Sequence, residues 1–193
     1  MSSSSEVLPD DFPDAINRVV FDQETISRRV GELADTISQD YSGKNTVVVG
    51  ILQGAYAFTC DLINELDFPV SPEFIRISRY QKPFTGEVEI VEDVQQDITG
   101  QHVLLVEDIV DTGLTLNFLV QILLDRNPAS LAVCALLDRS ELRLVDIPIK
   151  YVGFQVNDEF LIGYGLDFRG SYRDLPFVAT MNPQSVVPTN LSA

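Results

Sequence analysis

The fold of this chain is decided by the stretch HVLLVEDIVDTGLT, residues 102–115 of 193. Its apolar run, residues 103–106, is typical of a strand that is buried on both faces of a sheet. Two adjacent carboxylates, Glu107 and Asp108, follow the run, and Asp111 comes three residues later. The stretch therefore predicts a core strand that carries acidic side chains to its carboxyl end.

The second half of the same stretch is suited to binding phosphate. Thr112, Gly113 and Thr115 stand where a helix over residues 115–126 is expected to begin. Hydroxyl groups, a permissive glycine and the N–H groups of a helix N-terminus together form a cradle for a phosphate monoester. Carboxylates beside such a cradle repel the phosphate unless they bind a ribose diol or a divalent cation, and hard oxygen ligands suit Mg²⁺. The alternative is an acidic, solvated turn before an ordinary capped helix.

Strand-like and helical segments alternate along the rest of the chain. Asp22 is expected to cap a first helix that ends at Gly43, and a second helix is expected over residues 55–66. Further strands are expected over residues 46–52, 74–80, 131–137, 151–154, 160–164 and 177–181. This order predicts an α/β fold of parallel βαβ units with helices on both faces, and ligands at the carboxyl ends of the strands.

The domain organisation follows from the ends and one long polar segment. Residues 1–15 are expected to be a flexible tail, residues 16–182 a single domain and residues 183–193 a loose tail. Residues 81–100 are polar and acidic, which indicates either a mobile lid or a small hairpin between two strands.

Composition excludes several classes of protein. The net charge of −16 argues against nucleic acid and anionic membranes as partners, because both are bound chiefly through lysine and arginine. No apolar run approaches the roughly 20 residues that span a bilayer, and the first residues lack the features of a secretory signal. Cys60 and Cys134 both lie in apolar segments, so free thiols and a cytoplasmic location are expected. The only histidine, His102, is not expected to act in the site.

Several motifs together resemble one enzyme family. VLLVEDIVDTGLTL resembles the phosphoribosyl pyrophosphate (PRPP) signature of type I phosphoribosyltransferases. YVGF and FLIGYGLDFRGSYRDLP, at residues 151–154 and 160–176, resemble the C-terminal half of hypoxanthine-guanine phosphoribosyltransferases. ILQGAY stands at the place of that family's pyrophosphate loop, and FIRISRY at the start of its mobile loop. The resemblance implies a mostly parallel, twisted sheet flanked by helices, with a small hood and a mobile lid loop.

The resemblance also implies an activity. Such an enzyme would be a pentosyl glycosyltransferase of purine salvage that uses Mg²⁺. It would transfer the 5-phosphoribosyl group from PRPP to N9 of hypoxanthine or guanine, giving IMP or GMP and pyrophosphate. Its partners would be these small molecules, and it would form a homodimer or homotetramer.

Site residues are carried over from the family by position. Glu107 and Asp108 would hold the ribose hydroxyls and support Mg²⁺, Asp111 would handle the proton on the purine N7, and Asp167 would bind a second Mg²⁺. The contacts to PRPP and its phosphates would come from Gln53, Gly54, Arg79, Tyr80, Asp108, Asp111, Thr112, Gly113, Leu114, Thr115 and Arg173. The purine would be held by Ile109, Arg139, Phe160, Leu161 and Asp167.

Three positions depart from the family pattern. Gln53 replaces a lysine of the pyrophosphate loop, Arg79 replaces the serine before Tyr80, and Arg139 replaces the lysine that donates to the 6-oxo group. Arginine still donates to an oxo group, although its planar fork does not fill the place of a point charge. The choice among hypoxanthine, guanine and xanthine therefore stays open. Arg139 is alternatively one half of a surface ion pair beside Asp138.

Other functions remain as alternatives. One is a regulator with the same fold, similar to the RNA-binding proteins of pyrimidine operons, against which the charge argues. A second is a non-catalytic relative, and a third is half of an aspartic protease, because residues 111–113 also spell that enzyme's Asp-Thr-Gly triplet. Lys82, Arg143 and Lys150 are expected to be solvated charges without a role in the site.

Overall fold

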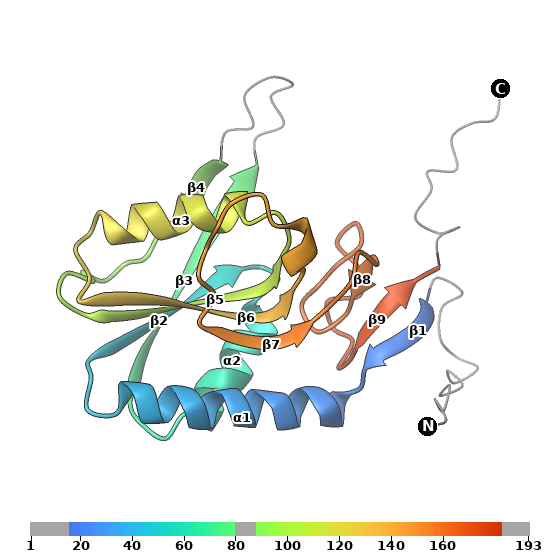
Figure 1. Ribbon diagram of the computed structural model, residues 1–193, viewed down its shortest axis with the longest axis horizontal. Helices are drawn as coiled ribbons and strands as arrows, with labels where there is room; N and C mark the ends of the chain where they lie inside the picture. The colour runs from blue at the N-terminus through green and yellow to red at the C-terminus, as the bar shows by residue number, and fades with distance from the viewer. Residues whose placement is uncertain (1–15, 80–87, 183–193) are drawn as a thin grey trace.

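The computed structural model describes residues 16–79 and 88–182, and a six-stranded sheet lies at their centre (Figure 1). The strand order is β4-β3-β2-β5-β6-β7, and only the β3–β4 pair is antiparallel. The strands are β2 (Thr46–Leu52), β3 (Val70–Arg79), β4 (Val88–Glu92), β5 (His102–Val110), β6 (Ser130–Asp138) and β7 (Tyr151–Gln155). The chain moves from β2 outward to β3 in one direction and to β5 in the other. The predicted α/β fold with a mostly parallel sheet is confirmed, and its switch point lies between β2 and β5.

Three helices cover the two faces of the sheet (Figure 1). Helices α1 (Gln23–Tyr41) and α2 (Tyr56–Glu65) lie on one face, and α3 (Leu114–Leu124) lies on the other. As predicted, Asp22 caps α1, because its Oδ1 accepts a hydrogen bond from the Thr25 N–H at 2.7 Å. None of the helices among the described residues is both long enough and apolar enough to cross a membrane.

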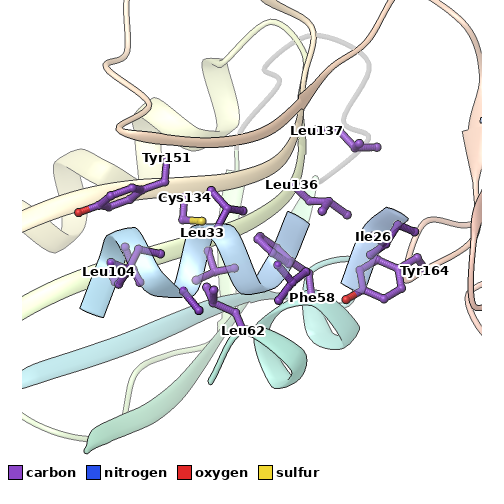
Figure 2. Close-up of a cluster of buried hydrophobic side chains, with 14 of the residues drawn as sticks. Ile26, Leu33, Phe58, Leu62, Leu104, Cys134, Leu136, Leu137, Tyr151 and Tyr164 are labelled. Carbon is purple, nitrogen blue, oxygen red and sulfur yellow. The ribbon is translucent and has the colours of Figure 1, made fainter. Parts of the chain in front are cut away.

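Each face of the sheet has its own hydrophobic core. Val48 packs with the cores of α1 and α2, whereas Val47 and Val49 on the same strand pack with α3. This alternation is the geometry of a strand buried on both faces. Figure 2 shows the first core, where Leu33 of α1 and Phe58 of α2 meet side chains of β5, β6 and β7.

A small antiparallel sheet forms the predicted hood (Figure 1). It consists of β1 (Ile16–Phe21), β9 (Val178–Met181) and β8 (Leu161–Ile162), in that order. The hood has a separate core that contains Ile16, Ile162, Ala179 and Met181. The hood is connected to the main domain twice. β1 continues through Asp22 directly into α1, and the chain enters the hood again after β7, where it continues to β8.

The structure differs from the sequence prediction in several elements. β5 reaches Val110, four residues beyond the expected end, because β6 pairs with it as far as Val110–Asp138. The pairing of β5 with β2 ends earlier, at Gly50–Val106. The edge of residues 107–110 that faces β2 is therefore not paired with β2, and it borders the site. β8 is shorter than expected because a turn closed by mutual hydrogen bonds between Gly163 and Leu166 follows it at once.

The long polar segment is a hairpin in its described part. β4 pairs with β3 in antiparallel register, which supports the hairpin interpretation for residues 88–92. Tyr80, Lys82 and the other residues of the expected lid up to residue 87 lie outside the described residues, as do the two expected tails. β1 and a short 3-10 helix, η1 (Ser140–Leu142), were not predicted at all.

Candidate active site

A cleft of about 270 Å³ opens at the carboxyl ends of the parallel strands β2 and β5. At this point the order in which strands are added to the sheet reverses. Most of the residues that the sequence assigned to the site line this cleft. They are Gly54, Glu107, Asp108, Ile109, Asp111, Thr112, Gly113, Thr115, Asp167 and Arg173. Apolar side chains that the sequence did not single out complete the wall, namely Ile51, Leu52, Ile77, Val110 and Leu116.

Glu107 and Asp108 enter the cleft from the extension of β5 beyond β2. Glu107 is only 9% exposed, and its Oε1 accepts a hydrogen bond from the Asp108 N–H at 3.1 Å. Asp108 Oδ1 in turn accepts from the Ile109 N–H at 2.8 Å. These local bonds fix the directions of two neighbouring carboxylates, which present hard oxygen atoms to the cleft.

The loop after β2 packs directly against Asp108. A Cβ atom on Gly54 would lie 1.6 Å from Asp108 Oδ2, so only glycine allows this approach. The Leu52–Gln53 peptide bond at the start of this loop is cis. Gly165, from the loop after β8, packs against Gly54 in turn. A Cβ atom on Gly165 would lie 1.9 Å from the Gly54 carbonyl oxygen. Asp108 of β5, the β2 loop and the β8–β9 loop of the hood are therefore packed against one another in that order.

The phosphate loop, residues 111–115, leads from β5 into α3. Gly113 is the N-cap of α3 and has a φ of +80°, a left-handed conformation that glycine adopts without strain. Gly113 has no side chain that could cap the helix, and Thr112 Oγ1 accepts a long hydrogen bond of 3.5 Å from the Leu114 N–H in the first turn. The Thr112 carbonyl accepts from the Leu144 N–H at 3.0 Å, which ties the loop to the segment after η1. A helix N-terminus of this kind is suited to an anion.

Arg139 is not the surface residue that one interpretation of the sequence suggested. Its side chain is 12% exposed, and Nη1 lies 2.9 Å from Asp111 Oδ1 rather than beside Asp138. Nε donates to the Asn157 carbonyl at 3.1 Å, and Nη2 donates to the Glu159 carbonyl. Arg139 thus joins the acidic end of β5 to the loop that precedes Phe160.

Arg143 contradicts the prediction of a solvated charge. Its side chain is 15% exposed and forms an ion pair with Asp138, whose side chain is 8% exposed. Its Nε also donates to the Asp111 carbonyl at 3.2 Å. The sequence contained one signal that an arginine from another segment lies near residues 111–115. Residues 83–125 hold no lysine or arginine, so a cation close to that loop has to come from elsewhere in the chain.

Asp167 and Arg173 face each other across the far wall of the cleft. Arg173 Nη2 lies 2.7 Å from Asp167 Oδ1, and its Nη1 donates to the Gly165 carbonyl at 2.5 Å. Asp167 Oδ2 accepts from the Gly170 N–H at 2.6 Å. The predicted pair is therefore held in place by the turn that carries it.

The remaining predicted residues lie around the cleft rather than in its lining. The ring of Phe160 belongs to a residue that is 43% exposed, and it packs edge-to-face on Phe168 at 5.6 Å. Leu161 is buried and pairs with Thr180 in the hood. Leu114 is exposed at the start of α3.

Gln53 lines a neighbouring cavity that also contains Arg173. The side chain of Arg79 and all of Tyr80 lie outside the described parts.

Other titratable groups offer little to the site. Burial raises the pKa of the Cys134 thiol far above its usual value, so this cysteine is no nucleophile. Lys150, also predicted to be solvated, is half-exposed and lies 2.6 Å from Asp40 on the far side of α1. Within residues 16–79 and 88–182, no group of three or more histidine, cysteine, aspartate or glutamate side chains is arranged to hold a metal ion by itself. Mg²⁺ commonly needs only one or two carboxylates beside substrate phosphates and water, which the Glu107–Asp108 pair fits.

Comparison with known proteins identifies the family of the chain. Residues 19–169 match the model of the phosphoribosyl transferase domain. The hypoxanthine-guanine-xanthine phosphoribosyltransferase of Tritrichomonas foetus is 42% identical over 170 residues, which cover 87% of this chain and 93% of that protein. The hypoxanthine-guanine phosphoribosyltransferase of Dictyostelium discoideum is 43% identical over 172 residues, covering 86% and 96%.

A solved structure extends the likeness to the fold. The crystal structure of a hypoxanthine phosphoribosyltransferase from Staphylococcus aureus has a TM-score of 0.87 and 39% sequence identity, and the alignment covers 91% of this chain and 96% of that one. The chain therefore belongs to the phosphoribosyltransferase family, among the hypoxanthine-guanine phosphoribosyltransferases.

Proposed function

We propose that the cleft binds PRPP and a 6-oxopurine base and transfers the 5-phosphoribosyl group to N9 of the base. The products would be IMP or GMP and pyrophosphate, in purine salvage. The observation that carries this proposal is the meeting of the phosphate loop, the Glu107–Asp108 pair and the Asp167–Arg173 pair in one cleft. The relatives in Tritrichomonas foetus and Dictyostelium discoideum, which are named for hypoxanthine and guanine, support the choice of bases.

The phosphate loop would hold the 5′-phosphate. Thr112, Gly113 and Thr115 line the cleft at the N-terminus of α3. Main-chain N–H groups, hydroxyl groups and the helix dipole attract a dianion without a lysine or arginine. This suits a loop that lies within a segment free of basic residues.

Glu107 and Asp108 would bind the ribose hydroxyls and help to hold Mg²⁺, and Asp167 would serve a second ion on the pyrophosphate side. When bound, Mg²⁺ would neutralise the pyrophosphate as it leaves. Arg173 would bind the same oxygen atoms, and Gly54 and Gln53 would add contacts from the β2 loop. Arg79 and Tyr80 stay proposed contacts of the lid.

Asp111 would accept or return the proton on N7 of the purine while the glycosidic bond forms. Its carboxylate lines the cleft and is oriented by Arg139 at 2.9 Å. Arg139 lies beside the cleft and not in its lining, and it would offer the purine donors beyond its three protein contacts, because a guanidinium has five. A donor at this place favours an oxo group at position 6.

The purine ring would lie between Ile109 and Phe160. Ile109 lines the cleft, and Phe160 leaves a large part of its surface open beside Phe168. The Leu161 main chain would read the edge of the base. Aromatic and aliphatic surfaces of this kind bind a planar heterocycle with little ordering cost.

We also propose a cytoplasmic location and a homodimeric or homotetrameric assembly. Both cysteines, Cys60 and Cys134, are free thiols, as in proteins of a reducing compartment.

Two alternatives lose their basis. Residues 111–113 lead into α3 on a parallel sheet, so the aspartic protease interpretation is wrong. The net charge of −16 continues to argue against an RNA-binding regulator.

A panel of purine bases tests the proposed reaction. With PRPP and Mg²⁺, we expect nucleotide formation from hypoxanthine and guanine, and at least about 100-fold lower kcat/KM with adenine, because its amino group cannot accept from Arg139. The kcat/KM with xanthine shows whether the enzyme also accepts this third 6-oxopurine. Failure to form a nucleotide from any 6-oxopurine would refute the proposal, and PRPP binding without turnover would identify a non-catalytic relative.

Asp111→Asn tests the proton-handling role. Asparagine keeps the size of the side chain and a contact to Arg139, so we expect an unchanged melting temperature. The loss of the carboxylate should lower kcat by about 100-fold or more, the usual range for a general acid or base. Steady-state kinetics at saturating substrates measure this, and an unchanged kcat contradicts the role.

Arg139→Met tests the reading of the purine. The change removes the donor to the 6-oxo group, so the KM for hypoxanthine should rise by about tenfold or more, and far more than the KM for PRPP. Arg139→Lys should restore part of the purine affinity, because the ammonium group still donates to oxygen. Equal effects on both KM values would show that Arg139 serves the loop and not the base.

Removal of Mg²⁺ tests how the pyrophosphate is held. Because residues 83–125 contain no basic side chain, we expect PRPP affinity to fall by at least about tenfold when EDTA replaces Mg²⁺. Binding of IMP, which has no pyrophosphate, should change much less. Isothermal titration calorimetry measures both, and a PRPP affinity that ignores Mg²⁺ is the contrary result.

A further inference from the structure

We propose that Arg143 is a positioning residue that presets the main chain of the phosphate loop, and that its buried ion pair with Asp138 exists to hold it there. The inference rests on the proposed binding of the 5′-phosphate by residues 111–115. It concerns residues that do not themselves line the cleft.

The Arg143 guanidinium is held by a carboxylate that has a second partner of its own. Nη2 contacts Asp138 Oδ1 at the end of β6, and Asp138 Oδ2 accepts from Gln155 Nε2 of β7 at 2.9 Å. Both partners of the ion pair are largely buried. A buried pair contributes little net stability compared with apolar side chains of similar size, so stability alone does not account for it.

The fixed guanidinium has a further donor that reaches the phosphate loop. Arg143 Nε donates to the Asp111 carbonyl at 3.2 Å, and the next residue, Leu144, donates its N–H to the Thr112 carbonyl at 3.0 Å. Two consecutive carbonyls of the loop are therefore held by one short segment that follows η1.

The planarity of the peptide bond turns this into a statement about the N–H groups. In a trans peptide the carbonyl and the N–H of the same unit point in opposite directions. Because the Asp111 and Thr112 carbonyls face Arg143 and Leu144, the N–H groups of Thr112 and Gly113 face away from that segment. Thr112 and Gly113 line the cleft, so their N–H groups are directed to the place of the phosphate.

Packing limits any movement of the loop toward its support. A Cβ atom on Gly113 would lie 2.9 Å from Arg143 Cδ and 3.1 Å from side-chain carbons of Val145 and Ile147. The alkyl part of Arg143 thus fills the space behind the loop while its guanidinium holds the carbonyl. Arg143 therefore both donates a hydrogen bond to the loop and blocks its movement toward the segment after η1.

The test compares Arg143→Met with the double change Arg143→Met and Asp138→Asn, in the full-length chain. The single change leaves a buried carboxylate unpaired, so it should lower the melting temperature. The double change removes that charge and should recover most of the melting temperature. Neither variant retains the donor to the Asp111 carbonyl.

We expect both variants to weaken phosphate binding equally. The KM for PRPP and the dissociation constant of IMP should rise by about tenfold, the usual effect of one lost hydrogen bond from a charged donor. The dissociation constant of inosine, which has no phosphate, and the KM for hypoxanthine should stay within about twofold. Isothermal titration calorimetry and steady-state kinetics measure these values.

Arg126→Met is the matched control. Arg126 forms an ion pair with Asp93 at 2.8 Å, beyond the far end of α3, so its loss should leave IMP and PRPP binding unchanged. If the Arg143 double variant regains both stability and phosphate affinity, Arg143 has only a structural role and the proposal is overturned.

Thr115→Val separates this inference from the proposed function. If Thr115→Val weakens IMP binding but Arg143→Met does not, the phosphate loop stands and the positioning role is refuted. If neither change affects IMP binding, the loop does not bind the 5′-phosphate and both proposals fail.

Discussion

The site depends on the contact of three main chains around the side chain of Asp108. Gly54 lies against the Asp108 carboxylate, and Gly165 lies against the Gly54 carbonyl, at distances that leave no room for a Cβ atom. Through this contact the β2 loop, the end of β5 and the β8–β9 loop of the hood come together at one position. Arg173 reinforces it by donating to the Gly165 carbonyl while it pairs with Asp167. The placement of Asp108, Asp167 and Arg173 relative to one another therefore follows from how closely these glycines approach.

The distribution of charge shows how so acidic a chain could form the proposed site for phosphates. No lysine or arginine occurs between residues 83 and 125, yet this segment supplies most of the acidic wall and the phosphate loop. The cations come from later in the chain. Each of three arginines is paired with one carboxylate, in the pairs Arg139–Asp111, Arg143–Asp138 and Arg173–Asp167. The arginines thus orient the acidic groups, and in the proposed function the 5′-phosphate is left to N–H groups and hydroxyls.

Local sequence predicted the strand from residue 103 and the helix that follows it, because the apolar run and the Thr-Gly-x-Thr pattern act over a few residues. It failed where pairing is long-range. β1 pairs with β9, which lies at the other end of the described chain, and nothing in INRVVF reveals that partner. Asp138 and Arg139 are adjacent, which suggested a pair, but neighbouring side chains at a strand end point to opposite sides. Asp138 therefore meets Arg143, and Arg139 meets Asp111.

The segment from Arg139 to Leu144 connects the two halves of the proposed chemistry. Arg139 holds the side chain of Asp111, and Arg143 holds its main-chain carbonyl. Arg139 also binds the carbonyls of Asn157 and Glu159, immediately before Phe160. A lysine at this position would present one point charge and no rigid fork. With arginine, one segment holds three parts of the proposed site. They are the Asp111 carboxylate proposed to move the purine proton, the loop proposed to hold the phosphate, and the chain that leads to Phe160. Because the three share one support, a movement of any one of them strains the contacts of the other two.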